Sequence, residues 1–191
     1  SSDLNEIQDN GFSYTLGAGG VSTGSKSVLT INLNRCVQYA VNKEIDYKEF
    51  LSHIIDLCHK VQLAYNENLK DLLRHHMLPL FDAGYINIDR QYLTIGINGL
   101  VESAEFMGLD ITPNDDYKEY VQGILGLIEA YNKQYRTKEA MFNCEMIPAE
   151  NVGVKHAKWD KADGYFVPRD CYNSYFYRVE DNSLTILDKF R

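Results

Sequence analysis

The chain has 191 residues, of which 45% are hydrophobic and 24% are charged, and its formal net charge is −8 at pH 7. These values predict one globular domain with a hydrophobic core, and the negative charge excludes a global basic field that would attract nucleic acid or an anionic membrane. No apolar run predicts a transmembrane helix, the N-terminus lacks the regions of a signal peptide, and four scattered cysteines favour a reduced, cytoplasmic protein without a disulfide framework.

Residues 1–26 are polar and rich in glycine, which predicts a loop. Gly19 and Gly24 have the spacing of a phosphate-binding P-loop, but an extra serine precedes Lys26, and the loop comes before a strand instead of after one. We therefore interpret this segment as a flexible connector, with a loop that folds over a substrate as the alternative. The β-prone apolar run at residues 27–33 then predicts a buried strand.

The rest of the chain alternates between strand and helix patterns. Apolar residues at helical spacing predict helices over about residues 47–77 (with Asp46 as N-cap and Pro79 at the end), 99–107, 115–136 and 149–158. Short β-prone runs predict two more strands, at residues 92–97 and 140–147. From Trp159 onward the sequence is aromatic and rich in turn residues, which predicts a hairpin or a loop. We interpret its aromatic side chains as packing against the protein instead of stacking on nucleic-acid bases.

This alternation, without internal sequence repeats, indicates an α/β fold with parallel strands and helical crossovers. Ligands bind at the carboxyl ends of such strands. The sharpest strand end here is the third, where Pro148 is predicted at the first position of a helix. The backbone N–H groups of Ala149, Glu150 and Asn151 would then lack partners within the helix and would suit a phosphate. The Glu150 side chain has a second interpretation, as a carboxylate that stabilises the helix start.

Two polar residues within the strands are further candidate site residues. Asn32 interrupts an apolar strand, so its amide either pairs with a neighbouring backbone group or points into a cavity and binds substrate. Glu145 is predicted to share a strand face with Asn143. If it is buried, its raised pKa would suit acid–base chemistry; the alternative is a solvent-facing residue at the end of a strand.

The histidines and cysteines give no catalytic or metal-binding pattern. The five histidines show no HxxxH or HExxH spacing and are interpreted mostly as solvent-facing helix positions, so no metal site is predicted within the chain. Cys58 lies on the apolar face of the long predicted helix. Cys36 and Cys144 flank the strands, but nothing in the sequence marks either as a low-pKa thiol.

Three segments, in this order, resemble the anaerobic, glycyl-radical (class III) ribonucleoside-triphosphate reductases. They are VLTINLNR at residues 28–35, LTIGINGLVESAEFMG at residues 93–108, and FNCEMIPAENVGVKHAKWDK at residues 142–161. The similarity covers nearly the whole chain. Two departures are Asn34, where the family usually has proline, and Asn151, where it usually has serine.

The resemblance implies a helix-rich α/β fold that is part of a ten-stranded barrel of the glycyl-radical enzyme and ribonucleotide reductase type, with residues 1–191 as a single fragment of the catalytic domain. It implies reduction of ribonucleoside triphosphates to deoxyribonucleoside triphosphates by glycyl and thiyl radicals. Asn32 would lie near the ribose and Glu145 would be a ribose-side carboxylate, while Ala149, Glu150 and Asn151, after Pro148, would hold the triphosphate.

The resemblance also places several parts of the machinery elsewhere. The radical glycine, the thiyl cysteine and a zinc site would lie outside this chain, so the fragment alone would be inactive and would hold no cofactor. The whole enzyme would bind ATP or dNTP effectors, receive its radical from a radical-SAM activating enzyme, form a homodimer, and work in the cytoplasm on nucleotides for DNA replication.

Two other functions stay open at this point. One is a complete, noncatalytic α/β module that binds a nucleotide or a partner and folds alone as a monomer. The other is a different glycyl-radical enzyme acting on a small acid or alcohol, which the IGINGL and PAEN motifs disfavour. Because the sequence starts in a polar loop and stops after an apolar run, we expect an excerpt from a longer polypeptide.

Overall fold

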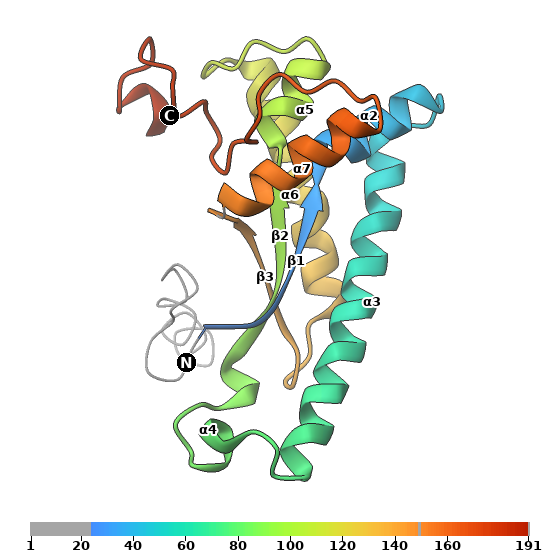
Figure 1. The fold of residues 1–191 in the computed structure, drawn as a ribbon, viewed down its shortest axis with the longest axis vertical. Coiled ribbons are helices and arrows are strands. Elements are labelled where there is room, and N and C mark those ends of the chain that lie inside the picture. The colour runs from blue at the N-terminus through green and yellow to red at the C-terminus, as the bar shows by residue number, and fades with distance from the viewer. Residues whose placement is uncertain (1–23, 149, 191) are drawn as a thin grey trace.

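The computed structural model describes residues 24–148 and 150–190, and it shows a mixed α/β fold built on a parallel three-stranded sheet in the order β1-β2-β3 (Figure 1). The strands are β1 (Gly24–Asn32), β2 (Gln91–Asn98) and β3 (Met141–Met146). The helices are α2 (Leu33–Asn42), α3 (Tyr47–Arg74), α4 (Pro79–Asp82), α5 (Leu100–Phe106), α6 (Asp115–Tyr135) and α7 (Glu150–Ala162), with 3₁₀ turns at Ile88–Arg90 and Asp188–Phe190. None of these helices is long and apolar enough to cross a membrane.

The three predicted strands are confirmed, with shifts of a few residues at their ends. The predicted glycine-rich loop lies mostly outside the described residues, but its last three residues, 24–26, belong to β1. β1 ends at Asn32 instead of Leu33 because Asn32 caps the next helix, its Oδ1 accepting a hydrogen bond from the Arg35 backbone N–H (3.1 Å).

Helix α2 was not predicted. It buries Leu33, Val37 and Ala40 on one side, and this spacing of four and three residues is typical of an amphipathic helix. Helix α3 confirms the long predicted helix and its N-cap, since the Asp46 carboxylate accepts hydrogen bonds from the N–H groups of Lys48 and Glu49. At about 1.5 Å per residue, α3 is about 42 Å long. It runs beside the sheet and continues past the end of the strands toward α4 (Figure 1).

Helix α7 is longer than predicted. It continues through Trp159 to Ala162, four residues beyond the predicted end, so the aromatic segment starts later than expected. Residues 163–187 contain no helix or strand in the described part of the chain, which agrees with the prediction of a loop but not of a hairpin.

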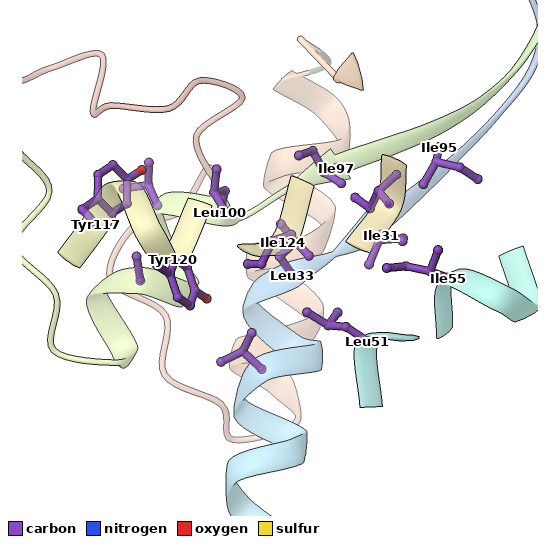
Figure 2. Close-up of a cluster of buried hydrophobic side chains, with 14 of the residues drawn as sticks. Ile31, Leu33, Leu51, Ile55, Ile95, Ile97, Leu100, Tyr117, Tyr120 and Ile124 are labelled. Carbon is purple, nitrogen blue, oxygen red and sulfur yellow. The ribbon is translucent and has the colours of Figure 1, made fainter. Parts of the chain in front are cut away.

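One face of the sheet is apolar and covered by helices. Ile31 of β1 and Ile95 and Ile97 of β2 are buried in the main hydrophobic cluster (Figure 2). From α3 and α6 the same cluster receives Leu51, Ile55, Ile124 and Ile128. Both crossovers, from β1 to β2 and from β2 to β3, therefore place their helices on this one face.

The opposite face of the sheet is mainly polar, although Val28, Tyr92 and Met141 also belong to it. Side chains alternate along a strand, and the register of the three strands puts a second set of residues on this face: Thr30, Asn32, Thr94, Gly96, Asn98, Asn143 and Glu145. The fold thus separates an apolar side, which supplies stability, from a polar side, which holds most of the candidate residues.

Candidate binding site at the carboxyl ends of the strands

A buried carboxylate, Asp160, attaches α7 to the carboxyl end of β1 and to the first turn of α2. Its side chain is 0% exposed, and Arg35 Nε donates to it at 2.6 Å. Asn32 Nδ2 lies 3.0 Å from each carboxylate oxygen. Asn34 Nδ2 (3.3 Å) and the Tyr172 hydroxyl (2.8 Å) also donate. A buried charge is tolerated only when it is paired and hydrogen-bonded, and these four residues meet that condition for Asp160.

The charge that compensates Asp160 is Arg35. Its guanidinium also forms an ion pair with Asp163 (Nη2 to Oδ2, 2.6 Å) and lies over the ring of Tyr165, 5.1 Å from its centre. Burial opposes the charged form of Arg35, but the hydrogen bonds to Asp160 and Asp163 outweigh it, so the pKa of Arg35 is raised. Arg35 therefore stays a cation and fixes the end of α7 by its charge.

The carboxyl end of β2 is attached to the same helix. Asn98 is 0% exposed, its Oδ1 accepts a hydrogen bond from His156 Nδ1 (3.0 Å), and its Nδ2 donates to the backbone oxygen of Asn173 (3.3 Å). Burial lowers the pKa of His156, which favours the neutral imidazole. Gly99 follows with a φ of 77°, and a Cβ there would lie 3.2 Å from the Tyr172 ring, so the turn requires glycine.

At the end of β3 the chain turns into α7. The Ile147 N–H donates to the Ile97 carbonyl (3.2 Å) and continues the pairing of β3 with β2. Pro148 is exposed and comes two residues before the first helical residue, Glu150, so its prediction at the first helical position was wrong. The structure does not describe Ala149 or the Glu150 side chain.

The first turn of α7 lies at the carboxyl edge of the sheet (Figure 1), and helix starts leave N–H groups without partners in the helix. Asn151 is exposed in this turn, and Lys155 is exposed four residues later, hence on the same side of the helix. The arrangement offers backbone donors, an amide and one cation at one point. Such a set fits an anionic group.

A chain of hydrogen bonds crosses the polar face of the sheet and ends at Glu145. The Ser25 hydroxyl contacts the Thr94 hydroxyl, which donates to Asn143 Oδ1 (2.7 Å). Asn143 Nδ2 in turn donates to Glu145 Oε1 (2.7 Å). Glu145 and Asn143 therefore share a face as predicted, and Glu145 is half-buried with one oxygen held in a fixed position.

The two strand candidates lie on the same face but on different outer strands. Asn32 is on β1 and Glu145 on β3, with β2 between them. Two strand spacings separate the strands by about 10 Å, and the Ile147 side chain lies over Gly96 of the strand between them. The Asn32 side chain does pair with a backbone group, the Arg35 N–H, which was one of the two interpretations of this residue. It also donates a hydrogen bond to Asp160.

Sequence analysis missed a second buried carboxylate, Glu102 of α5. It is 0% exposed and accepts hydrogen bonds from Arg169 Nη1 (2.6 Å) and from the backbone N–H (3.0 Å) and Nδ2 (2.9 Å) of Asn173. These contacts fasten the irregular segment after α7 to α5. The only signal in the sequence was an acidic residue in a first helical turn, which does not reveal a partner 67 residues away.

Two of the five histidines contradict the expectation of solvent-facing positions. His59 is 0% exposed and hydrogen-bonded to Ile55 O (2.8 Å) and Asn132 Oδ1 (2.8 Å), and His156 is the buried residue described above. The other three, His53, His75 and His76, are exposed as expected. In residues 24–148 and 150–190, no three His, Cys, Asp or Glu side chains are grouped so that they could hold a metal ion.

The cysteines are all free thiols. Burial raises the pKa of Cys36 to about 12, and it raises the pKa of Cys144 to about 12 as well. Burial also raises the pKa of Cys58. The thiolate is the reactive form, so burial disfavours the reactive form of these three cysteines.

Comparison with known proteins gives one consistent result. The family model for anaerobic ribonucleoside-triphosphate reductase matches residues 3–191. Similar solved structures are those of the anaerobic ribonucleotide reductase from Thermotoga maritima, in complex with dATP and CTP (TM-score 0.82), with dATP bound in the specificity site (0.81) and with glycerol in the active site (0.81). Each is 28% identical and is covered over 30%, 31% and 30% of its length, while 92% of this chain is covered. No curated protein matches the chain.

Proposed function

The chain belongs to the anaerobic ribonucleoside-triphosphate reductase family, and on that premise we propose that it is the substrate-binding part of an enzyme that reduces ribonucleoside triphosphates to deoxyribonucleoside triphosphates. The chain spans about 30% of the length of the solved reductases that it matches, so the complete activity would belong to a longer polypeptide. Support comes from the match over residues 3–191 and from the Thermotoga maritima structure in complex with dATP and CTP.

We propose that the three strands are part of the family's ten-stranded barrel. Their sequential parallel order and the placement of both crossovers on one face support this architecture. In a doubly wound sheet helices cover both faces, whereas in a barrel they form only the outer ring. The polar face of the sheet would then line the barrel interior.

The radical chemistry would be supplied by residues outside this chain. We assign the family's zinc site, the glycyl radical and the thiyl cysteine to residues outside this chain. The same proposal includes ATP or dNTP effectors, a radical-SAM activating enzyme, a homodimer and a cytoplasmic location.

The observation that carries the substrate-binding role is the placement of α7. Its first turn lies at the carboxyl edge of the sheet (Figure 1), and its body is attached to β1 through Asp160 and to β2 through His156. A triphosphate on a chain of net charge −8 needs local donors. Ala149, Glu150 and Asn151 would supply backbone N–H groups, and the side chains of Asn151 and Lys155 would add an amide and a cation.

The ribose would lie over the polar face of the sheet. Glu145 would be the carboxylate on its side, oriented by Asn143. Asn32 would approach the ribose from β1. One N–H of its side-chain amide would donate to the ligand and the other to Asp160. Both roles place the reacting sugar beside the triphosphate held at the start of α7.

Equilibrium binding to the full-length reductase tests the triphosphate site. We expect Pro148→Gly combined with Asn151→Ala to weaken binding of a ribonucleoside triphosphate about tenfold, because hydrogen bonds to a charged group are lost and the turn loosens. Binding of the corresponding nucleoside should not change. The matched control is Asn68→Ala, at an exposed position of α3. Unchanged triphosphate affinity in the double variant would refute the assignment.

A further inference from the structure

We propose that Asp160 is a positioning residue, whose carboxylate fixes α7 against β1 and α2 and thereby sets where the first turn of α7 meets the triphosphate. The inference rests on the proposed function of that turn. Asp160 itself lies ten residues after Glu150, at the far end of the helix. At 1.5 Å per residue the two positions are about 15 Å apart, so Asp160 would act only through the helix.

Local preferences do not explain an aspartate at this position. Asp160 is in the last turn of α7, where the helix dipole disfavours a negative charge, and its side chain is 0% exposed, where an unpaired carboxylate is costly. What stabilises it is tertiary: the donors come from the end of β1, from the first turn of α2 and from the segment after α7. Asp160 is therefore the point where these three segments and α7 are joined.

The donors also fix direction. Arg35 Nε and Asn32 Nδ2 reach Oδ1, while Tyr172 OH, Asn34 Nδ2 and again Asn32 Nδ2 reach Oδ2. Both oxygens are engaged from different sides, so the carboxylate cannot shift without leaving buried donors unpaired.

The start of α7 is also in contact with the segment after the helix. A Cβ at Gly153, three residues after Glu150, would lie 2.7 Å from the Tyr172 backbone oxygen, so helix and segment are in direct contact there. Because α7 is a single rigid element, a rotation of about 4° at Asp160 would move its first turn by about 1 Å. A misplacement of that size can cost about a hundredfold in rate when a reacting group depends on it.

Glu102 provides a matched comparison within the same molecule. Like Asp160 it is a fully buried carboxylate that binds an arginine and the segment after α7. Its described hydrogen bonds go to Arg169 and Asn173, neither of which belongs to α7. A change at Glu102 should therefore reduce stability without moving the first turn of α7.

The test uses the full-length reductase with CTP and cytidine as probes, and it measures the ratio of their dissociation constants. We expect Asp160→Asn and Tyr172→Phe to weaken CTP binding about tenfold relative to cytidine, because only CTP uses the displaced triphosphate donors. An effect on Asn32 beside the ribose would act on both probes and cancel in the ratio. Glu102→Gln should lower the melting temperature and leave this ratio unchanged. A role in stability alone would shift the melting temperature of all three variants and the ratio of none.

The outcomes separate this inference from the proposed function. If the variant with both Pro148→Gly and Asn151→Ala loses CTP affinity while Asp160→Asn and Tyr172→Phe keep the wild-type ratio, the positioning role is overturned and the triphosphate site stands. If none of these variants changes CTP affinity, the triphosphate site is wrong and the positioning role falls with it. Should Asp160→Asn fail to fold, Tyr172→Phe, which keeps the ring and removes one donor, decides the question.

Discussion

Asn32 and Asn98 occupy paired positions at the ends of neighbouring strands, and each uses its side-chain amide to hold a residue of α7. Asn32 donates to Asp160, and Asn98 accepts from His156. An amide side chain can donate and accept hydrogen bonds at the same time. Asn32 therefore binds α7 and caps α2, and Asn98 binds α7 and the backbone of Asn173. The two anchors differ in one respect: His156 can take up a proton, and its burial opposes the charged form.

His156 should make the stability of the chain pH-dependent. Burial lowers its pKa below the ordinary value of 6.5, with Asp160 opposing and Arg35 adding to the effect. The unfolded chain therefore binds the proton more readily, and the stabilising contribution present above pH 6.5 is lost as the pH falls through the folded-state pKa. Urea unfolding between pH 8 and 5 should show a steeper loss for wild type than for His156→Gln. His53→Gln, at an exposed position, should follow wild type, and identical slopes for all three proteins would contradict the assignment.

At the scale of elements, Gly96 leaves space on β2 for the Ile147 side chain, which follows β3. A Cβ there would lie 2.5 Å from Ile147 Cγ1 and 2.8 Å from Thr30 Oγ1. We expect Gly96→Ala to destabilise the chain by about 1–3 kcal/mol in urea unfolding, because the added methyl group overpacks the space that Ile147 fills. Shortening Ile147 to alanine in the same chain should recover part of the loss.

The control for Gly96 is another glycine with room around it. Gly126 is exposed in α6, and a Cβ there would meet nothing within 4 Å. Gly126→Ala should therefore stabilise the chain by roughly 0.5–1 kcal/mol, through helix propensity alone. Destabilisation of equal size at both positions would show that crowding at Ile147 is not the cause.

The strands and the long helices could be predicted because each is marked by its own local pattern. The N-cap Asp46 and the apolar spacing of α3 are two such cases. The end of α7 could not be predicted this way. Trp159 begins an aromatic stretch that is typical of a loop, and the helix continues past it because Asp160 meets Arg35 and Asn32, more than 120 residues away. Helix α2 did have a signal, a capping asparagine before an amphipathic run, that the strand pattern obscured.

The same distinction applies to the candidate site. Which residue types stand at the strand ends could be read from the sequence, and Asn143 and Glu145 share a face because side chains alternate along a strand. The partners of Asn32 and the buried state of Glu102 depend on how distant segments pack. No pattern within either segment encodes that packing.

At the scale of the whole molecule, the sheet has two different sides. Helices from both crossovers cover the apolar side, and the carboxyl ends of β1 and β2 are closed by α7 and the segment after it (Figure 1). The polar side keeps Glu145 and the hydrogen-bond chain that leads to it. This division agrees with the proposed place of the sheet in a substrate-binding barrel, where the apolar side would face the outer helices and the polar groups would face the interior.

The most direct test of this account is product formation by the full-length reductase. The protein is activated under anaerobic conditions, the glycyl radical is verified by electron paramagnetic resonance, and each ribonucleoside triphosphate is supplied with formate or a thiol system. We predict that a deoxyribonucleoside triphosphate forms, and that Pro148→Gly with Asn151→Ala raises the substrate concentration needed for half-maximal rate. An enzyme that carries the radical but forms no deoxynucleotide from any of the four substrates would contradict the account.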